Sequence, residues 1–309
     1  MLDLETYLTA LYVEVDRFCK AHVPAPAPTR GRKPSLSVSE VVTLAIFGQW
    51  AMFGSERGYL RWANRHLRPF FPTLPHPSQV NRLQQQHQTT ITAFALHLGQ
   101  SLIAPDERYE ILDGTGLAVR NDRRGGTGWV PELGEVGSCR RLGWFDGFRL
   151  LVCAGERGVV TGWGCGSAIT GERALTDTLF EARCVGHPAL PSAGITMGAC
   201  YLADMGFSGE DCQQRWRDLY GAVVVSPPQR GSKREWDEDW TRELSRIRQV
   251  IESVFGRLLH NFRLEHERPH TLGGFLARLA AKMALHNACI WFNRQAGQPD
   301  LAIASLLAW

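Results

Sequence analysis

Three acidic residues stand where their side chains could share metal ions. Asp113 lies near the end of a predicted strand, Asp204 follows a second short apolar run, and Glu252 lies on a predicted helix. Carboxylate oxygens are the ligands that Mg²⁺ accepts, whereas zinc favours histidine or cysteine. Two such ions about 4 Å apart would stabilise the entering and leaving oxygens of an in-line phosphoryl displacement. The three acids therefore predict a site for two Mg²⁺ ions, which Mn²⁺ can replace.

The helix that carries Glu252 has one apolar stripe. Within residues 241–262 apolar side chains recur at three- and four-residue steps, the period of a helix with one buried face; they are Leu244, Ile247, Ile251, Val254, Phe255, Leu258 and Phe262. Glu252 adjoins the stripe, so its carboxylate is expected at the border between core and solvent. Arg248 lies one turn before it and Gly256 one turn after. The pattern fits a charge or phosphate contact at Arg248, and equally a solvated Glu–Arg pair.

The order of the predicted elements indicates how these acids could meet. Strands are expected over 109–115, 148–154, 159–165, 200–203 and 222–226, with helices over 172–183, 208–219 (capped by Ser208) and 272–294 besides the one above; residues 121–143 are expected to form a loop or an irregular hairpin. This order predicts an α/β fold, a mixed sheet flanked by helices in a ribonuclease-H-like layout. The strands before Asp113 and Asp204 are neighbours in that layout, and ligands gather where such strands end.

The N-terminal part is predicted to be all-α and to contact DNA. Helices are expected over 2–20, 40–52 and 59–66, and another follows Ser78 as its cap, with Asn81, Arg82 and several glutamines mostly exposed. Short helices around a tight turn suit a helix-turn-helix that enters a major groove. Between Arg17 and Gln100 there are ten lysines and arginines against two acids, and the basic run contains Arg32 and Lys33. Such a balance suits a polyanionic partner.

Composition bounds the remaining possibilities. The chain has 309 residues, 44% apolar and 21% charged, with a formal net charge of +3, values typical of a globular protein with room for two domains. Eight scattered cysteines without a CxxC pair predict reduced thiols and a cytoplasmic location. No apolar run is long enough to span a bilayer. Neither a nucleophile elbow nor a P-loop is present.

Four stretches of the chain resemble the DDE transposases of bacterial insertion sequences, of the compact kind with an N-terminal helical domain. They are ILDGTGLAV at 111–119, YLADMGF at 201–207, RQVIESVFGRL at 248–258 and GGFLARLAAKMALHNACIWFNR at 273–294. The resemblance covers residues 36 to 295 and implies a helical DNA-binding domain over 1–105, a ribonuclease-H-like catalytic domain over 106–295 and a tail over 296–309. It implies Mg²⁺-dependent strand cleavage at transposon ends and strand transfer into target DNA.

The resemblance also implies roles for single residues. Asp113 would be shared between the two ions, Asp204 and Glu252 would hold one each, and Arg248 would lie near a DNA phosphate. Many relatives carry a tyrosine and a lysine where this chain has Ser245 and Leu259. Phosphate contacts are therefore assigned to other cations nearby, namely Arg246, Arg257 and His260. The implied partners are the terminal inverted repeats and target DNA, bound by a homodimer, with further backbone contacts from Arg123, Arg124, Arg140, Arg141, Arg230, Lys233 and Arg234.

Alternative readings stay open at this point. The same acids would serve a structure-selective nuclease or junction resolvase of this fold, and a DNA-binding protein could keep the fold without catalysis. His260, His266 and His270 are not expected to bind zinc, because no cysteine pair accompanies them. Trp144 and Trp163 could stack on an unpaired base, but burial against the sheet is the expectation for both.

Overall fold

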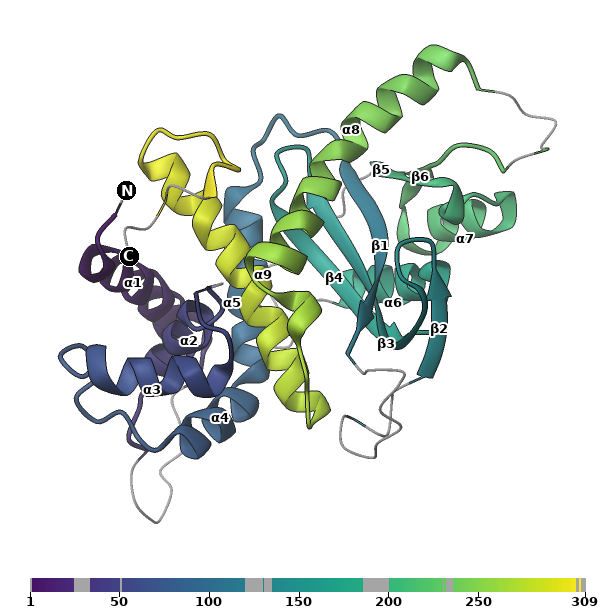
Figure 1. The fold of residues 1–309 in the computed structure, drawn as a ribbon. Helices are drawn as coiled ribbons and strands as arrows, with labels where there is room; N and C mark the ends of the chain where they lie inside the picture. The colour runs from purple at the N-terminus through teal and green to yellow at the C-terminus, as the bar shows by residue number, and fades with distance from the viewer. Residues whose placement is uncertain are drawn as a thin grey trace.

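The chain folds into one mixed sheet with helices on both faces and a bundle of helices at its side (Figure 1). The computed structural model describes residues 2–24, 34–50, 52–119, 130, 135–185, 200–229, 231, 236–303 and 306. The two ends of the chain lie close together in the bundle, where the Leu2 N–H donates to the Leu306 carbonyl. No helix in these described ranges is long and apolar enough to cross a membrane. All eight cysteines are free thiols.

The bundle holds the four helices expected near the N-terminus and a fifth, over residues 88–102, that the sequence did not predict. They are α1 (Leu4–His22), α2 (Val38–Phe47), α3 (Glu56–His66), α4 (Pro77–Gln86) and α5 (Gln88–Leu102). Ser37 caps α2 in a capping box with Glu40. The expected Ser78 cap of α4 is wrong: this helix begins at Pro77, and the His76 ring accepts from the Ser78 N–H. A proline suits the first helical position because its missing N–H would have no partner there.

The sheet has the strand arrangement predicted from the sequence. Its six strands are β1 (Glu110–Ala118), β2 (Glu135–Cys139), β3 (Gly143–Gly155), β4 (Val160–Ser167), β5 (Cys200–Ala203) and β6 (Val223–Val225). β3 pairs antiparallel with β1 on one side and with β2 and β4 on the other, whereas β1, β5 and β6 run parallel. The result is a ribonuclease-H-like α/β fold. The described part of the expected loop contains β2, which supports the hairpin reading.

Helices cover both faces of the sheet. On one face lie α6 (Glu172–Val185) and α7 (Glu210–Tyr220), whose core includes Phe180, Tyr201 and Trp216. The expected Ser208 cap of α7 is wrong, since Gly209 occupies the N-cap and the Ser208 hydroxyl donates to the Met205 carbonyl. On the other face, α8 (Glu238–Gly256) crosses the strands diagonally (Figure 1). A π-helical turn, Arg257–Asn261, continues α8.

The last helix, α9 (Leu272–Gln295), joins the bundle to the sheet. It lies between them in Figure 1 and is buried along most of its length. The Asn287 side-chain amide donates to the carbonyls of Ala95 on α5 and Val160 on β4, and its oxygen accepts from the Val160 N–H. One apolar core therefore extends from α1 to α9 across residue 105. The domain boundaries at 105 and 295 stay a prediction.

Candidate active site

Asp113 and Asp204 lie at neighbouring positions because their strands pair in parallel. The register aligns Leu112 of β1 with Ala203 of β5, so the next residue on each strand is an aspartate. Asp113 was expected near the end of its strand, but β1 continues to Ala118 by pairing with β3. β5, in contrast, ends at Ala203. The two carboxylates therefore meet at the point where β5 stops and leaves the flank of β1 open.

The charge of this pair of aspartates is only partly balanced. Burial, the largest cause, raises the pKa of Asp113 to about 6; Arg248 opposes this shift and Asp204 adds to it. Arg248 comes from α8, and its Nη2 lies 3.1 Å from Asp113 Oδ2. A raised pKa despite an ion pair means that the guanidinium does not offset the cost of burying the carboxylate charge. A divalent cation would compensate it, and hard oxygen ligands of this kind fit Mg²⁺.

A third carboxylate at this site, Glu172, was missed by the sequence analysis. It is the first residue of α6, and its side chain reaches the glycines that follow both aspartates, Gly114 and Gly206. A Cβ added at Gly114 would lie 2.6 Å from Glu172 Oε1, and one added at Gly206 would lie 2.9 Å from Oε2. A side chain at either position would therefore push the Glu172 carboxylate aside. The glycines after the two aspartates are the signal that could have revealed it.

The charge of Asp204 acts on Glu172. Burial raises its pKa and so does Asp204, while Arg149 on β3 opposes the shift. Arg149 Nη1 lies 3.1 Å from Glu172 Oε1. The Nε atoms of Arg149 and Arg248 are buried without a hydrogen-bond partner in the described structure. The site thus contains three close carboxylates and two guanidinium groups.

Glu252 is placed differently from the two aspartates. It lies one turn after Arg248 on α8, and its side chain is exposed rather than at the border of the core. Among the residues that the structure describes, no three acidic, histidine or cysteine side chains are arranged to hold one metal ion. The roles of Asp113, Asp204 and Glu252 as metal ligands stay predictions. An added Cβ at Gly256 meets nothing within 4 Å, so this glycine is not required by a close contact.

The residues predicted to contact DNA have varied surroundings. Arg246 is exposed and paired with Glu243, and His260 is exposed with Nδ1 3.4 Å from Glu265. Arg257 donates to the Ser253 and Leu301 carbonyls, which engages it in packing the C-terminal tail.

In the bundle, Asn81 is half-buried and donates to Glu56, while Arg82 is exposed. Gln84 is buried, which makes the expectation of mostly exposed amides on α4 wrong at that position. Arg141 pairs with Glu265, and Arg140 is exposed. The remaining predicted contacts lie outside the described residues: Arg32, Lys33, Arg123, Arg124, Arg230, Lys233 and Arg234.

Trp144 contradicts the expectation of burial, since it is 77% exposed beside the turn that joins β2 and β3. Side chains alternate along a strand, and its neighbour Phe145 takes the inward position against Gly116. Trp163 is half-buried.

Comparison with known protein families agrees with this geometry. The family model for the transposase DDE domain matches residues 111–288, which is more than half of the chain and includes Asp113, Glu172, Asp204 and Glu252. No curated protein and no solved structure matches the chain. The matched domain carries the paired aspartates on a ribonuclease-H-like sheet. The chain therefore belongs to the DDE transposase family of the insertion-sequence type.

Proposed function

We propose that this transposase cuts DNA at the ends of its element and joins the freed ends to target DNA. The observation that carries the proposal is the convergence of Asp113 and Asp204 where β5 ends, within the segment matched by the family model. In open sheets with parallel strands, ligands bind at this kind of position. The partner is double-stranded DNA, and we expect the chain to act on it as a homodimer.

The chemistry needs no nucleophilic side chain. Water attacks the phosphodiester at the element's end and releases a 3′-hydroxyl, and this hydroxyl then attacks a target phosphate in a direct transesterification. Two Mg²⁺ ions, when bound, would supply the positive charge that stabilises the entering and leaving oxygens. Asp113 and Asp204 would hold them from the sheet. The proposal keeps Glu252 as the predicted third ligand.

The arginines and Glu172 have supporting roles in this proposal. Arg248 lies four residues before Glu252, about 6 Å along the helix axis, and already reaches Asp113. It can hold the Asp113 carboxylate or turn to a phosphate. Glu172 pairs with Arg149 and fills the space beside Gly114 and Gly206. Its charge adds to the demand for cations at the site.

The test is to incubate the protein with the DNA that flanks its gene and Mg²⁺, and to map the cut ends and joined products. Asp113→Asn should lower the rate of strand cleavage by about a thousand-fold or more, since charge stabilisation by metals is worth several kcal/mol. Glu252→Gln should abolish cleavage as well. DNA binding, measured in EDTA, should survive both substitutions.

The outcomes separate the alternatives. Cleavage without joined products would favour the structure-selective nuclease. Binding at full affinity with no cleavage under any divalent ion would favour the silent DNA-binding protein. A variant that cuts at the wild-type rate would remove its residue from the site.

A further inference from the structure

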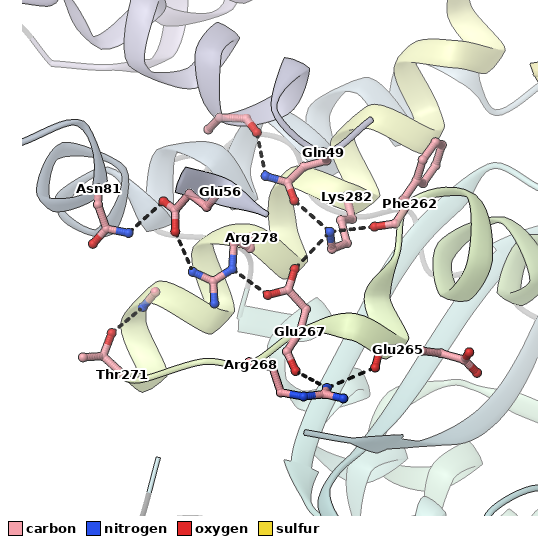
Figure 2. A network of polar contacts seen from close by, with 12 residues as sticks. Gln49, Glu56, Asn81, Phe262, Glu265, Glu267, Arg268, Thr271, Arg278 and Lys282 are labelled. Carbon is pink, nitrogen blue, oxygen red and sulfur yellow. Dashed lines mark hydrogen bonds and ion pairs between the residues drawn. The ribbon is translucent and has the colours of Figure 1, made fainter. Parts of the chain in front are cut away.

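A cleft of about 440 Å³ lies between the bundle and the segment that follows α8. Its walls come from the α2–α3 connection, from α4, from residues 262–271 and from α9. Figure 2 shows the polar network at its base, where residues from all these segments meet. The cleft is separate from the aspartate site, and the proposed chemistry does not use it.

The base of the cleft is a balanced set of charges. Glu267 is buried and accepts from Arg278 at 2.6 Å and from Lys282 at 3.0 Å, as Figure 2 shows. Arg278 also pairs with Glu56 at 3.5 Å, and Lys282 donates to the Gln49 side chain and the Phe262 carbonyl. Two carboxylates thus face two cations. The base is neutral and well ordered by these contacts.

The rim, in contrast, carries cations without matching acids. It contains Arg57, Arg263 and Arg268, and none of these has a carboxylate within 4.0 Å among the described residues. Arg268 is exposed, and within the described part of the chain it donates only to main-chain carbonyls, those of Ala118, Glu265 and Glu267. A guanidinium bonded to neutral carbonyls keeps its full positive charge. The rim therefore favours an anion.

The rim is also connected to the aspartate site through β1. Arg268 donates to the carbonyl of Ala118, and Arg141 donates to that of Gly116. Asp113 lies five residues before Ala118 on the same strand. At about 3.3 Å per residue this separation is about 17 Å, the length of about five base-pair steps of 3.4 Å. No small anion spans such a distance, but a duplex backbone does.

We propose that the rim of this cleft binds backbone phosphates of duplex DNA about five base pairs from the phosphodiester held at Asp113. The inference rests on the proposed function in taking DNA as the substrate. The cleft anchors the duplex, and the neutral network below holds Arg268 and Arg263 at a fixed place relative to β1. Phosphates rather than bases are bound, because guanidinium groups with no acidic partner are matched to anionic oxygens.

The first test compares two double variants for binding to a 30-base-pair duplex from the DNA flanking the gene. Arg57→Gln with Arg268→Gln removes two exposed rim cations while keeping side-chain amides as donors. Arg17→Gln with Arg157→Gln removes two exposed arginines from α1 and from the β3–β4 turn, at the opposite end of the strands from Ala118. Fluorescence anisotropy in EDTA, from 50 to 200 mM salt, gives the dissociation constant and its salt dependence.

The rim variant should bind at least about tenfold more weakly, and its slope of log affinity against log salt should fall by about 1.8, or 0.9 for each lost phosphate contact. The control variant should keep the wild-type slope. An unchanged slope in the rim variant, or an equal loss in the control, would overturn the proposal.

Hydroxyl-radical footprinting locates the contact. Protection about five base pairs from the cleavage position should be present in wild type and Asp113→Asn and absent in the rim variant. If the rim variant loses this protection and the wild-type protein cleaves no DNA, the result supports the cleft and rejects the transposition chemistry. Cleavage that depends on Asp113 with an unaltered footprint in the rim variant would reject the cleft alone.

Discussion

The aspartate site and the base of the cleft are built from the same groups, yet their carboxylates respond in opposite directions. At the aspartate site burial outweighs Arg248 and Arg149, and the pKa values of Asp113 and Glu172 are raised. At the cleft base burial also acts to raise the pKa of Glu267, but Lys282 and Arg278 outweigh it and the pKa is lowered.

The difference teaches which site can accept another cation. Three carboxylates share two arginines at the sheet, so negative charge is left over. At the cleft base, Glu267 and Glu56 face Arg278 and Lys282, so no negative charge is left over. The first arrangement suits a bound metal, and the second suits a structural anchor.

The largest expected effect comes from removing a cation at the cleft base, and it is on the free energy of unfolding. Lys282→Met leaves Glu267 with one cation instead of two in a buried place. Breaking a buried ion pair by removing one partner costs about 3–5 kcal/mol of unfolding free energy. Chemical denaturation should show a loss of that size in the free energy of unfolding, as a lower midpoint with an unchanged dependence of the free energy on denaturant concentration.

A matched variant separates charge from packing in the same place. Adding Glu267→Gln to Lys282→Met removes the unpaired charge and should recover more than half of the lost free energy, because both ionic partners are then gone. If the double variant is less stable than Lys282→Met, the network is not the anchor described.

Removing the charge of Asp113 should raise stability rather than lower it, because the ionised carboxylate is unfavourable in the folded chain. With a folded pKa of about 6 against an ordinary 3.8, its contribution to stability is present below pH 4 and is lost as pH rises through 6. At pH 7 the ionised carboxylate therefore costs about 3 kcal/mol. In EDTA, Asp113→Asn should melt a few degrees above wild type at pH 7, and the gap should close near pH 4. A gap that is independent of pH would mean that the raised pKa is wrong.

The sequence predicted the strands that carry the site better than it predicted which residues lie there. The two aspartates follow short apolar runs, and the layout that makes their strands neighbours follows from the element order, so their convergence could be anticipated. Glu172 could not be found in the same way, because a glutamate at the start of a helix is ordinary there. The approach of α6 to Gly114 and Gly206 places it at the site, and those two glycines are the trace of this approach in the sequence.

Other differences have similarly local causes. Trp144 and Phe145 are equally apolar, and the sequence does not say which one faces the core until the pairing of β2 with β3 fixes the register. Gln84 is buried because α4 turns that side toward the bundle. The cleft depends on contacts between segments far apart in the chain, such as Glu56 with Arg278, which no local pattern encodes.

The smallest expected effect is on metal affinity, when the charge of Glu172 is removed from the aspartate site. Glu172→Gln keeps the shape of the side chain and removes its charge, so Mn²⁺ affinity, followed by electron paramagnetic resonance, should fall by about 10- to 100-fold, the range for groups that support metal ligands. Glu181→Gln, exposed on the same helix, is the control and should bind Mn²⁺ like wild type.

Gly114→Ala should reproduce the Glu172→Gln effect without altering any carboxylate. Its new Cβ would lie 2.6 Å from Glu172 Oε1 and must displace that group from the aspartates. Glu252→Gln completes the series, because it removes the predicted ligand on α8. Wild-type Mn²⁺ binding in both Glu172→Gln and Gly114→Ala, with loss only in Glu252→Gln, would leave Glu172 as a partner of Arg149 alone. A graded loss in all three would mean that the negative charge of the whole group, rather than of a single triad, sets the affinity for the ion.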